Sequence, residues 1–176
     1  MSYYKVVGLN EEPFSTSPDP FFFYESKGHK AALYRLRVAL ELRRGLSVIL
    51  GDVGTGKTTL SRRLSQLLKD EPNLELVMVL NPMYENPLQF LADLLWHFHL
   101  SLDLEQGKTP TMMDCMIAIE HYLFRKCVEE GQTVVLLIDE SQKLCEACFE
   151  ILRALLNYET NQHKTLQLIL MGQMEL

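Results

Sequence analysis

The stretch ILGDVGTGKTTL, at residues 49–60, constrains the fold more than any other part of the chain. Gly51, Gly56, Lys57 and Thr58 match the spacing G-x-x-x-x-G-K-[ST]. Glycine adopts backbone angles closed to other residues, so the N–H groups of such a turn can point inward and surround an anion. An apolar run precedes the turn and a helical pattern follows it. The stretch therefore predicts a phosphate-binding loop between a strand and a helix.

Two side chains of this loop have separate expected roles. We expect Lys57 to reach the β- and γ-phosphates of a nucleotide, and the Thr58 hydroxyl to bind Mg²⁺. The helix that begins near Lys57 adds the positive end of its dipole. The alternative is a plain glycine turn with a surface lysine. The expected nucleotide-binding residues are Gly51, Asp52, Val53, Gly54, Thr55, Gly56, Lys57, Thr58 and Thr59.

The rest of the chain alternates between strand and helix patterns. Apolar runs predict strands at residues 46–50, 74–80, 133–139 and 166–171. Apolar spacing and start signals predict helices at residues 26–44, 87–100, 110–131 and 144–158, and one that begins near Lys57. In the helix at 110–131, one stripe holds Met113, Ile117, Phe124 and Val128. The alternation predicts an α/β fold in which helices flank a parallel sheet.

Composition limits the domain layout, the partners and the compartment. We expect an aromatic and proline-rich segment with a helix at 1–44, packed on a core at 45–176. The net charge of −6 argues against a surface that coats nucleic acid, although arginines cluster at 35–44 and 62–63. No apolar run approaches the ~20 residues that span a bilayer, and no secretory pattern opens the chain. We therefore expect a cytoplasmic chain with reduced cysteines.

An acid pair ends one of the expected strands. Asp139 and Glu140 follow the apolar run VVLLI. Ligands bind beyond the carboxyl ends of parallel strands, so this pair and the glycine loop can face each other. We expect Asp139 to hold Mg²⁺, directly or through water. Glu140 can polarise a water for attack on the γ-phosphate, which favours hydrolysis over transfer to a substrate hydroxyl. The alternative is an acidic turn without a catalytic role.

Polar side chains also follow two further strands. Asn81 comes after the strand at 74–80 and can hydrogen-bond Glu140, which would hold this carboxylate off the water until a partner binds. A simple Asn-Pro turn is an equal alternative. Gln173 follows the strand at 166–171 and can reach the γ-phosphate or the water, unless it belongs to a plain turn. The catalytic candidates are therefore Glu140, Lys57, Asn81 and Gln173.

Two cysteines follow the acid pair closely. Cys145 and Cys148, in CEAC, have the spacing of half a zinc site, but a structural zinc needs four ligands and no matching second pair is present. We favour packing for these cysteines, with redox or metal chemistry as the alternative.

Several stretches together resemble the AAA+ ATPases of the general secretion pathway protein A (ExeA) type. Relatives of this type include exosortase-associated and pilus-biogenesis enzymes and, more distantly, transposition ATPases of the TniB kind. The resemblance rests on the two nucleotide motifs, on YYKVVGLNEEPFSTSPDPFFFYESKGHKAAL, on LIDESQKL and on ILRALLNYETNQHKTLQLILMGQMEL. These stretches cover most of the chain.

The resemblance implies an oligomeric Mg²⁺-dependent ATPase that helps to assemble a secretion or cell-envelope complex with a membrane-associated partner. A nucleotide-gated binder of DNA, as in transposition, and a P-loop kinase stay open as alternatives. By analogy, Lys57 and Thr58 are Walker A residues and Asp139 and Glu140 are Walker B residues. Asn81 takes the glutamate-switch position and Gln173 the sensor-1 position.

Departures from the family pattern leave some roles open. Family members continue with a fifth strand and a helical lid that carries a sensor-2 arginine, so we expect a truncated core that lacks the lid. The family usually has proline where this chain has Met174. Arg125 and Arg153 are candidates for an arginine finger that reaches a neighbouring subunit. His29 is expected either near the adenine or on a helix surface.

Overall fold

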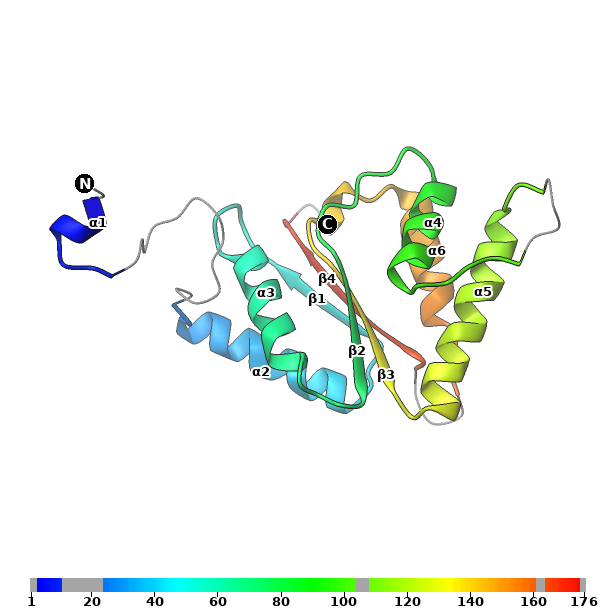
Figure 1. The fold of residues 1–176 in the computed structure, drawn as a ribbon, viewed down its shortest axis with the longest axis horizontal. Coiled ribbons are helices and arrows are strands. Elements are labelled where there is room, and N and C mark those ends of the chain that lie inside the picture. Colours follow the sequence, from blue (N-terminus) through cyan, green and yellow to red (C-terminus); the bar gives the residue numbers. More distant parts are fainter. Residues whose placement is uncertain (1–2, 11–23, 104–107, 161–163, 175–176) are drawn as a thin grey trace.

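Four strands form one all-parallel sheet in the computed structural model, which describes residues 3–10, 24–103, 108–160 and 164–174 (Figure 1). The strands are β1 (Leu46–Leu50), β2 (Leu74–Val79), β3 (Thr133–Ile138) and β4 (Leu166–Gly172). Their order in the sheet is β1-β4-β3-β2. The observed parallel sheet, with helices between successive strands, confirms the predicted α/β fold. Parallel neighbours need crossover connections, which the helices provide.

Helices cover both faces of this sheet, with α2 and α3 on one side and α4, α5 and α6 on the other (Figure 1). The helices are α1 (Tyr3–Val6), α2 (Lys27–Glu41), α3 (Lys57–Leu68), α4 (Pro87–His97), α5 (Met112–Phe124) and α6 (Glu146–Leu156). A π-helical turn, η2 (Arg125–Glu129), continues α5, and a 3-10 turn, η3 (Ser141–Lys143), precedes α6. Within the described residues, none of the helices combines the length and the apolar content needed to cross a bilayer. The expected aromatic and proline-rich loop falls largely on 11–23, outside the described residues.

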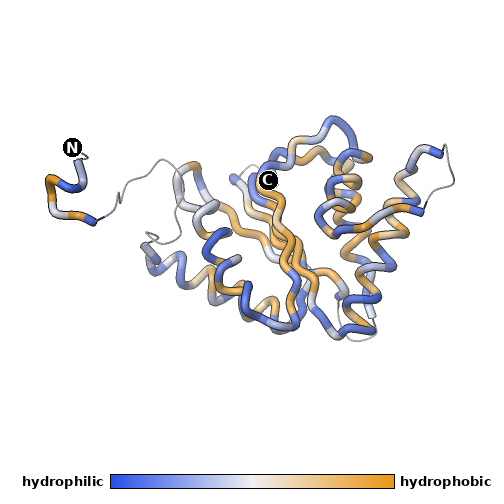
Figure 2. The backbone as a smooth tube through the Cα atoms, viewed as in Figure 1, coloured by the Kyte–Doolittle hydropathy of each residue, from blue (hydrophilic) through white to orange (hydrophobic). Residues whose placement is uncertain are grey.

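The central strands bury side chains on both faces of the sheet. In β3, Val134 and Leu136 face the core formed with α4, α5 and α6, whereas Val135 and Leu137 face α2 and α3. All residues of β4 are buried. Figure 2 shows the apolar residues gathered along the strands, between helices that carry both apolar and polar residues. Burial on both faces explains why these strands read as largely apolar runs, although β4 also buries Gln167.

The apolar stripe expected on α5 faces solvent instead of the core. All four of its residues are exposed, and Met113 is 68% exposed. The buried face carries Cys115, Ile119 and Leu123. Because apolar residues occur on both faces of this helix, their spacing does not decide which face packs. The α-helix also ends at Phe124 and continues as η2, which shifts the phase of the residues beyond it.

A buried glutamine joins the start of β1 to β4. Gln167 is 2% exposed, and its Oε1 accepts a hydrogen bond from the backbone N–H of Gly45 at 2.9 Å. We expect Gln167→Met to lower the free energy of unfolding by about 1–3 kcal/mol, because the buried N–H of Gly45 then has no acceptor. Urea unfolding followed by circular dichroism measures the change.

Gln66→Met is the matched control for this change. Gln66 is exposed on α3, so its replacement should alter the unfolding free energy by less than about 0.5 kcal/mol. Equal stabilities of the two variants would show that the Gly45 N–H finds water or another acceptor.

Candidate nucleotide-binding site

The glycine-rich loop lies between β1 and α3, at the carboxyl edge of the sheet. Gly54 and Gly56 have φ values of 80° and 85°, in the left-handed region that favours glycine. At Gly51, a Cβ atom would lie 2.9 Å from the Thr55 hydroxyl. This hydroxyl donates a hydrogen bond to the Asp52 carbonyl at 2.8 Å and so closes the turn. The local geometry therefore accounts for each glycine of the loop.

Lys57, the first residue of α3, folds its side chain back over this loop. Its Nζ donates hydrogen bonds to the carbonyls of Gly51 at 2.7 Å and Asp52 at 2.9 Å. Thr58 and Thr59 follow in the first helical turn and are half-buried, while Val53 is exposed at the tip of the loop. The ammonium group thus rests on carbonyl oxygens that phosphate oxygens can replace as acceptors.

Asp139 follows β3 directly and carries a buried oxygen without a donor. The residue is fully buried, and its Oδ1 accepts a hydrogen bond from the Glu140 N–H at 2.9 Å. Its Oδ2 has no hydrogen-bond partner among the described residues. Such an orphaned carboxylate oxygen is costly to bury. A cation or an ordered water would satisfy it, and oxygen donors such as those of Asp139 and Thr58 suit Mg²⁺.

Glu140 takes an unusual backbone conformation right after this aspartate. Its φ of 53° lies in the left-handed region, which costs a non-glycine residue roughly 1–2 kcal/mol. Its carboxylate meets two side chains of η3. The Glu140 Oε2 accepts a hydrogen bond from Gln142 Nε2 at 2.9 Å and lies 3.6 Å from Lys143 Nζ. The turn after β3 therefore holds this carboxylate with an amide and an ammonium group.

Asn81 and Gln173 reach Glu140 through η3 and not directly. Asn81 Oδ1 accepts a hydrogen bond from Lys143 Nζ at 3.0 Å, so Lys143 bridges Asn81 and Glu140. The backbone N–H of Gln173 donates to Gln142 Oε1 at 3.2 Å. We call these five residues, which join the ends of β2, β3 and β4, the strand-end network. A lysine bridge takes the place of the hydrogen bond expected between Asn81 and Glu140.

Sequence reasoning missed the two members of this network that η3 supplies. Gln142 and Lys143 follow the acid pair in IDESQKL, and that position was the one available signal. A solvated surface also requires a polar turn after a strand, so the sequence alone does not distinguish a functional network from an ordinary surface turn. Ser141 fixes the turn in place, since its buried hydroxyl donates to the Met171 carbonyl at 2.9 Å.

His29 connects α2 with the glycine-rich loop. Its Nε2 donates a hydrogen bond to the Thr55 carbonyl at 3.0 Å, and its Nδ1 lies 3.4 Å from the Tyr24 carbonyl. A carbonyl oxygen only accepts, so the Nε2 atom carries a proton in this contact. His29 therefore lies beside the loop, and its expected approach to the adenine stays a prediction.

The two arginine-finger candidates form ion pairs within their own chain. Arg125 Nε lies 3.5 Å from Glu130 Oε1, in the segment that leads into the start of β3 and so away from the carboxyl edge. On α6, an NH2 group of Arg153 lies 2.6 Å from Glu150 Oε2, and the Arg153 side chain is 71% exposed. Arg153 is therefore the more accessible of the two to a neighbouring molecule, and the role itself stays a prediction.

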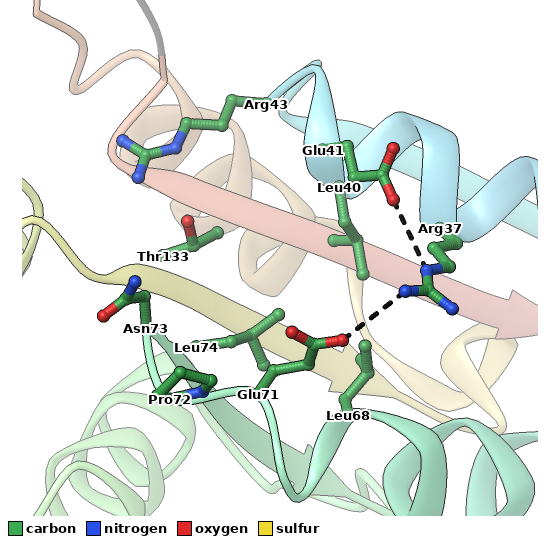
Figure 3. A pocket seen from close by; sticks show the side chains of 10 residues that line it. All are labelled: Arg37, Leu40, Glu41, Arg43, Leu68, Glu71, Pro72, Asn73, Leu74 and Thr133. Atoms are coloured by element: carbon green, nitrogen blue, oxygen red, sulfur yellow. Dashed lines mark ion pairs between the residues drawn. The ribbon is translucent and has the colours of Figure 1, made fainter.

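A hollow of about 360 Å³ opens at the opposite edge of the sheet (Figure 3). Leu74 and Thr133, the first residues of β2 and β3, line it. Arg37 Nε lies 3.4 Å from Glu41 Oε1, and an NH2 group of Arg37 lies 3.6 Å from Glu71 Oε1, so charges of both signs meet there. None of the expected phosphate-binding residues lines this hollow. The candidate nucleotide site, at the carboxyl edge of the sheet, is thus separate from this hollow.

Comparison with protein families identifies the sequence relatives of the chain. A model of the AAA domain matches residues 40–176. General secretion pathway protein A from Aeromonas hydrophila is 39% identical over 175 residues. This match covers 99% of the chain and 30% of that protein, so the chain spans less than a third of the relative's length. The predicted resemblance is confirmed.

Solved structures show the same fold in more distant proteins. Cdc6p from Pyrobaculum aerophilum has a TM-score of 0.67 at 19% identity, over 92% of this chain and 42% of that one. The ORC2 protein of Aeropyrum pernix in ADPNP–ADP complexes has a TM-score of 0.61 at 15% identity, over 92% and 44%. Drosophila ORC bound to DNA has a TM-score of 0.54 at 17% identity, over 95% and 48%. At these identities the likeness concerns the fold.

Proposed function

Because the chain belongs to the AAA domain family, we propose that it binds ATP at the loop of residues 51–59 and hydrolyses it. Water is the acceptor of the γ-phosphoryl group, and Glu140 orients that water. The proposal rests on one observation above all. Glu140 and the orphaned Oδ2 of Asp139 lie side by side at the carboxyl edge of the sheet, where the loop also begins.

Each residue of the loop has a role in this proposal. Its backbone N–H groups and the Lys57 ammonium bind the phosphate oxygens and offset the charge that develops on them. Lys57 gives up its contacts with the carbonyls of Gly51 and Asp52 when it does so. Thr58 and Asp139 would hold Mg²⁺, which neutralises phosphate charge when bound.

The strand-end network describes a resting state of Glu140. Its carboxylate accepts a hydrogen bond from Gln142 and lies beside Lys143, and both contacts hold it in the turn after β3. We infer that Lys143 moves away from Glu140 while it keeps its hydrogen bond to Asn81, and that this movement frees Glu140 to accept a proton from water. Asn81 and, through Gln142, Gln173 thereby act on the reaction as positioning residues.

The cellular role follows from the relative and is part of the same proposal. General secretion pathway protein A is named for secretion, and the chain matches nearly all of its own length to that protein. We propose that the chain works in the cytoplasm as a homo-oligomer, next to a membrane-associated secretion or cell-envelope partner. A neighbouring copy would then supply an arginine to the nucleotide, and Arg153 is the more accessible candidate.

The test follows a labelled γ-phosphate over a series of protein concentrations. We expect inorganic phosphate to be released, EDTA to stop the release, and the rate per chain to rise with concentration. Label on an acceptor other than water would support a kinase instead. Stimulation by DNA, with a steep dependence on salt, would favour the transposition-type alternative. Retention of ATP without release would contradict hydrolysis by this chain.

Lys143→Met should raise the rate of phosphate release about two- to fivefold, the effect of an ion pair of roughly 0.5–1 kcal/mol at a half-exposed site. The change removes the ammonium group 3.6 Å from Glu140 Oε2, which leaves the carboxylate without that ion pair and easier to move toward the water. Steady-state phosphate release at saturating ATP measures the effect. Lys143→Arg keeps the charge and is the control, with a rate near that of the unchanged chain. A lower rate in Lys143→Met would mean that Lys143 assists the reaction.

A further inference from the structure

Cys145 and Cys148 form a pair of thiols at the start of α6. Cys145 caps this helix and Cys148 lies one turn further on, with their Sγ atoms 3.4 Å apart. Cys145 is exposed, whereas Cys148 is fully buried. A disulfide needs sulfur atoms about 2.05 Å apart on residues whose Cα atoms lie within about 7 Å, and residues three apart in a helix are neighbours. The two sulfurs therefore need to approach by only roughly 1.4 Å.

The two thiols differ in acidity as well as in access to solvent. The backbone N–H of Cys148, and then its thiol, favour the thiolate of Cys145 and hold the pKa of Cys145 below its ordinary value. Burial, followed by the contact with Cys145, raises the pKa of Cys148 to about 12. The thiolate is the reactive form of cysteine. An attack on a solute therefore starts at Cys145, and Cys148 reaches no sulfur in solution before Cys145 has reacted.

We propose that Cys145 and Cys148 are a site of thiol–disulfide exchange, whose oxidised form carries a disulfide between them. The oxidant is a low-molecular-weight disulfide. The Cys145 thiolate attacks one of its sulfurs, forms a mixed disulfide and releases one thiolate. Cys148 then gives up its proton and attacks the Cys145 sulfur, which displaces the second thiolate. One solute disulfide becomes two thiols, the protein loses two hydrogens, and a dithiol reverses the reaction.

Two other cysteines provide internal controls. Cys115 on α5 and Cys127 on η2 are both buried. Cys127 Sγ also accepts a hydrogen bond from Arg43 at 3.6 Å. Across the residues that the structure describes, no group of three or more His, Cys, Asp and Glu side chains is placed to hold a metal ion. The proposed pair differs from Cys115 and Cys127 because Cys145 is exposed and its Sγ atom contacts that of Cys148.

The test uses the whole reduced chain and oxidised glutathione as the probe, without ATP. We expect the mass to fall by about two hydrogens, and a peptide map to show Cys145 joined to Cys148 with Cys115 and Cys127 still open to alkylation. This result needs no variant. A maleimide should label Cys145 at least about tenfold faster than Cys115 or Cys127 in the folded chain.

Variants separate the two steps. Cys148→Ala should accumulate a glutathione adduct on Cys145, and Cys145→Ser should form neither adduct nor disulfide. Cys127→Ser should form the bond as the unchanged chain does. Alkylation of all four cysteines after exposure to oxidised glutathione, with the circular dichroism of the folded chain preserved, would overturn the proposal. A glutathione adduct that persists on Cys145 of the unchanged chain would overturn it as well. Neither result bears on ATP hydrolysis.

Discussion

Glu140→Gln should lower the rate of phosphate release at least about a hundredfold while ATP affinity stays within about twofold. Glutamine keeps the shape of the side chain and an oxygen that can accept from Gln142, but its amide cannot take a proton from water. Glu140 follows β3 and lies outside the loop of residues 51–59, so the contacts of the phosphates with that loop should not change. Phosphate release and a nucleotide titration on the same preparation measure the two quantities.

Glu129→Gln is the matched control for this experiment. Glu129 is an exposed carboxylate in η2, which leads into the start of β3 at the opposite edge of the sheet. The same chemical change there should leave both rate and affinity as they were. If Glu140→Gln kept more than about a tenth of the rate, the orientation of water would belong to another residue.

Lys57→Met should weaken ATP binding about a hundredfold, which corresponds to about 2.7 kcal/mol, within the range of one or two charge-assisted hydrogen bonds. Methionine keeps an unbranched apolar stem in a position that is 9% exposed, yet it removes the ammonium group that rests on the carbonyls of Gly51 and Asp52. Calorimetric titration with ATP measures the affinity. Thermal unfolding with and without ATP should show that stabilisation by the nucleotide is lost.

Lys69→Met provides the comparison at the other end of the same helix. Lys69 is exposed at the C-cap of α3, and its loss should leave ATP affinity unchanged. Without nucleotide, both variants should unfold within about 1 kcal/mol of the unchanged chain. Undiminished affinity in Lys57→Met would contradict the assignment of the phosphate site to this loop.

The sequence predicts the sheet well because of how its strands are buried. The strands at residues 133–138 and 166–172 bury side chains on both faces of the sheet, so both read as mostly apolar runs, with the buried Gln167 as the exception in β4. The glycine-rich loop was predictable for a similar reason, since Gly54 and Gly56 take backbone angles that few other residues adopt. Both signals, the apolar runs and the glycine spacing, lie within short stretches of sequence, so they can be recognised without knowledge of contacts between distant segments.

The parts that the sequence did not predict depend on contacts between distant segments. Lys143 lies 62 residues from Asn81, and no spacing along the chain reports that their side chains meet. The packed face of α5 depends on what lies beneath it, because Met113 and Ile119 are both apolar and only one of them finds a neighbour in the core. The left-handed backbone of Glu140 has no local signal either, since glutamate seldom adopts it.

The sheet order has a consequence for the time at which the nucleotide site matures on the ribosome. Among the described strands, β1 pairs only with β4, and the Gly45–Gln167 bond that joins them closes over 122 residues of sequence. The ribosome adds about 5–20 residues per second, so β1 and the loop after it wait for many seconds without the strand that will hold them. The hydrogen bond from the Gly51 N–H to the Gly172 carbonyl, at 3.2 Å, forms later still, because Gly172 is made after Gln167. A nascent chain would thus acquire its affinity for nucleotide only after β4 has emerged, however early the loop itself is made.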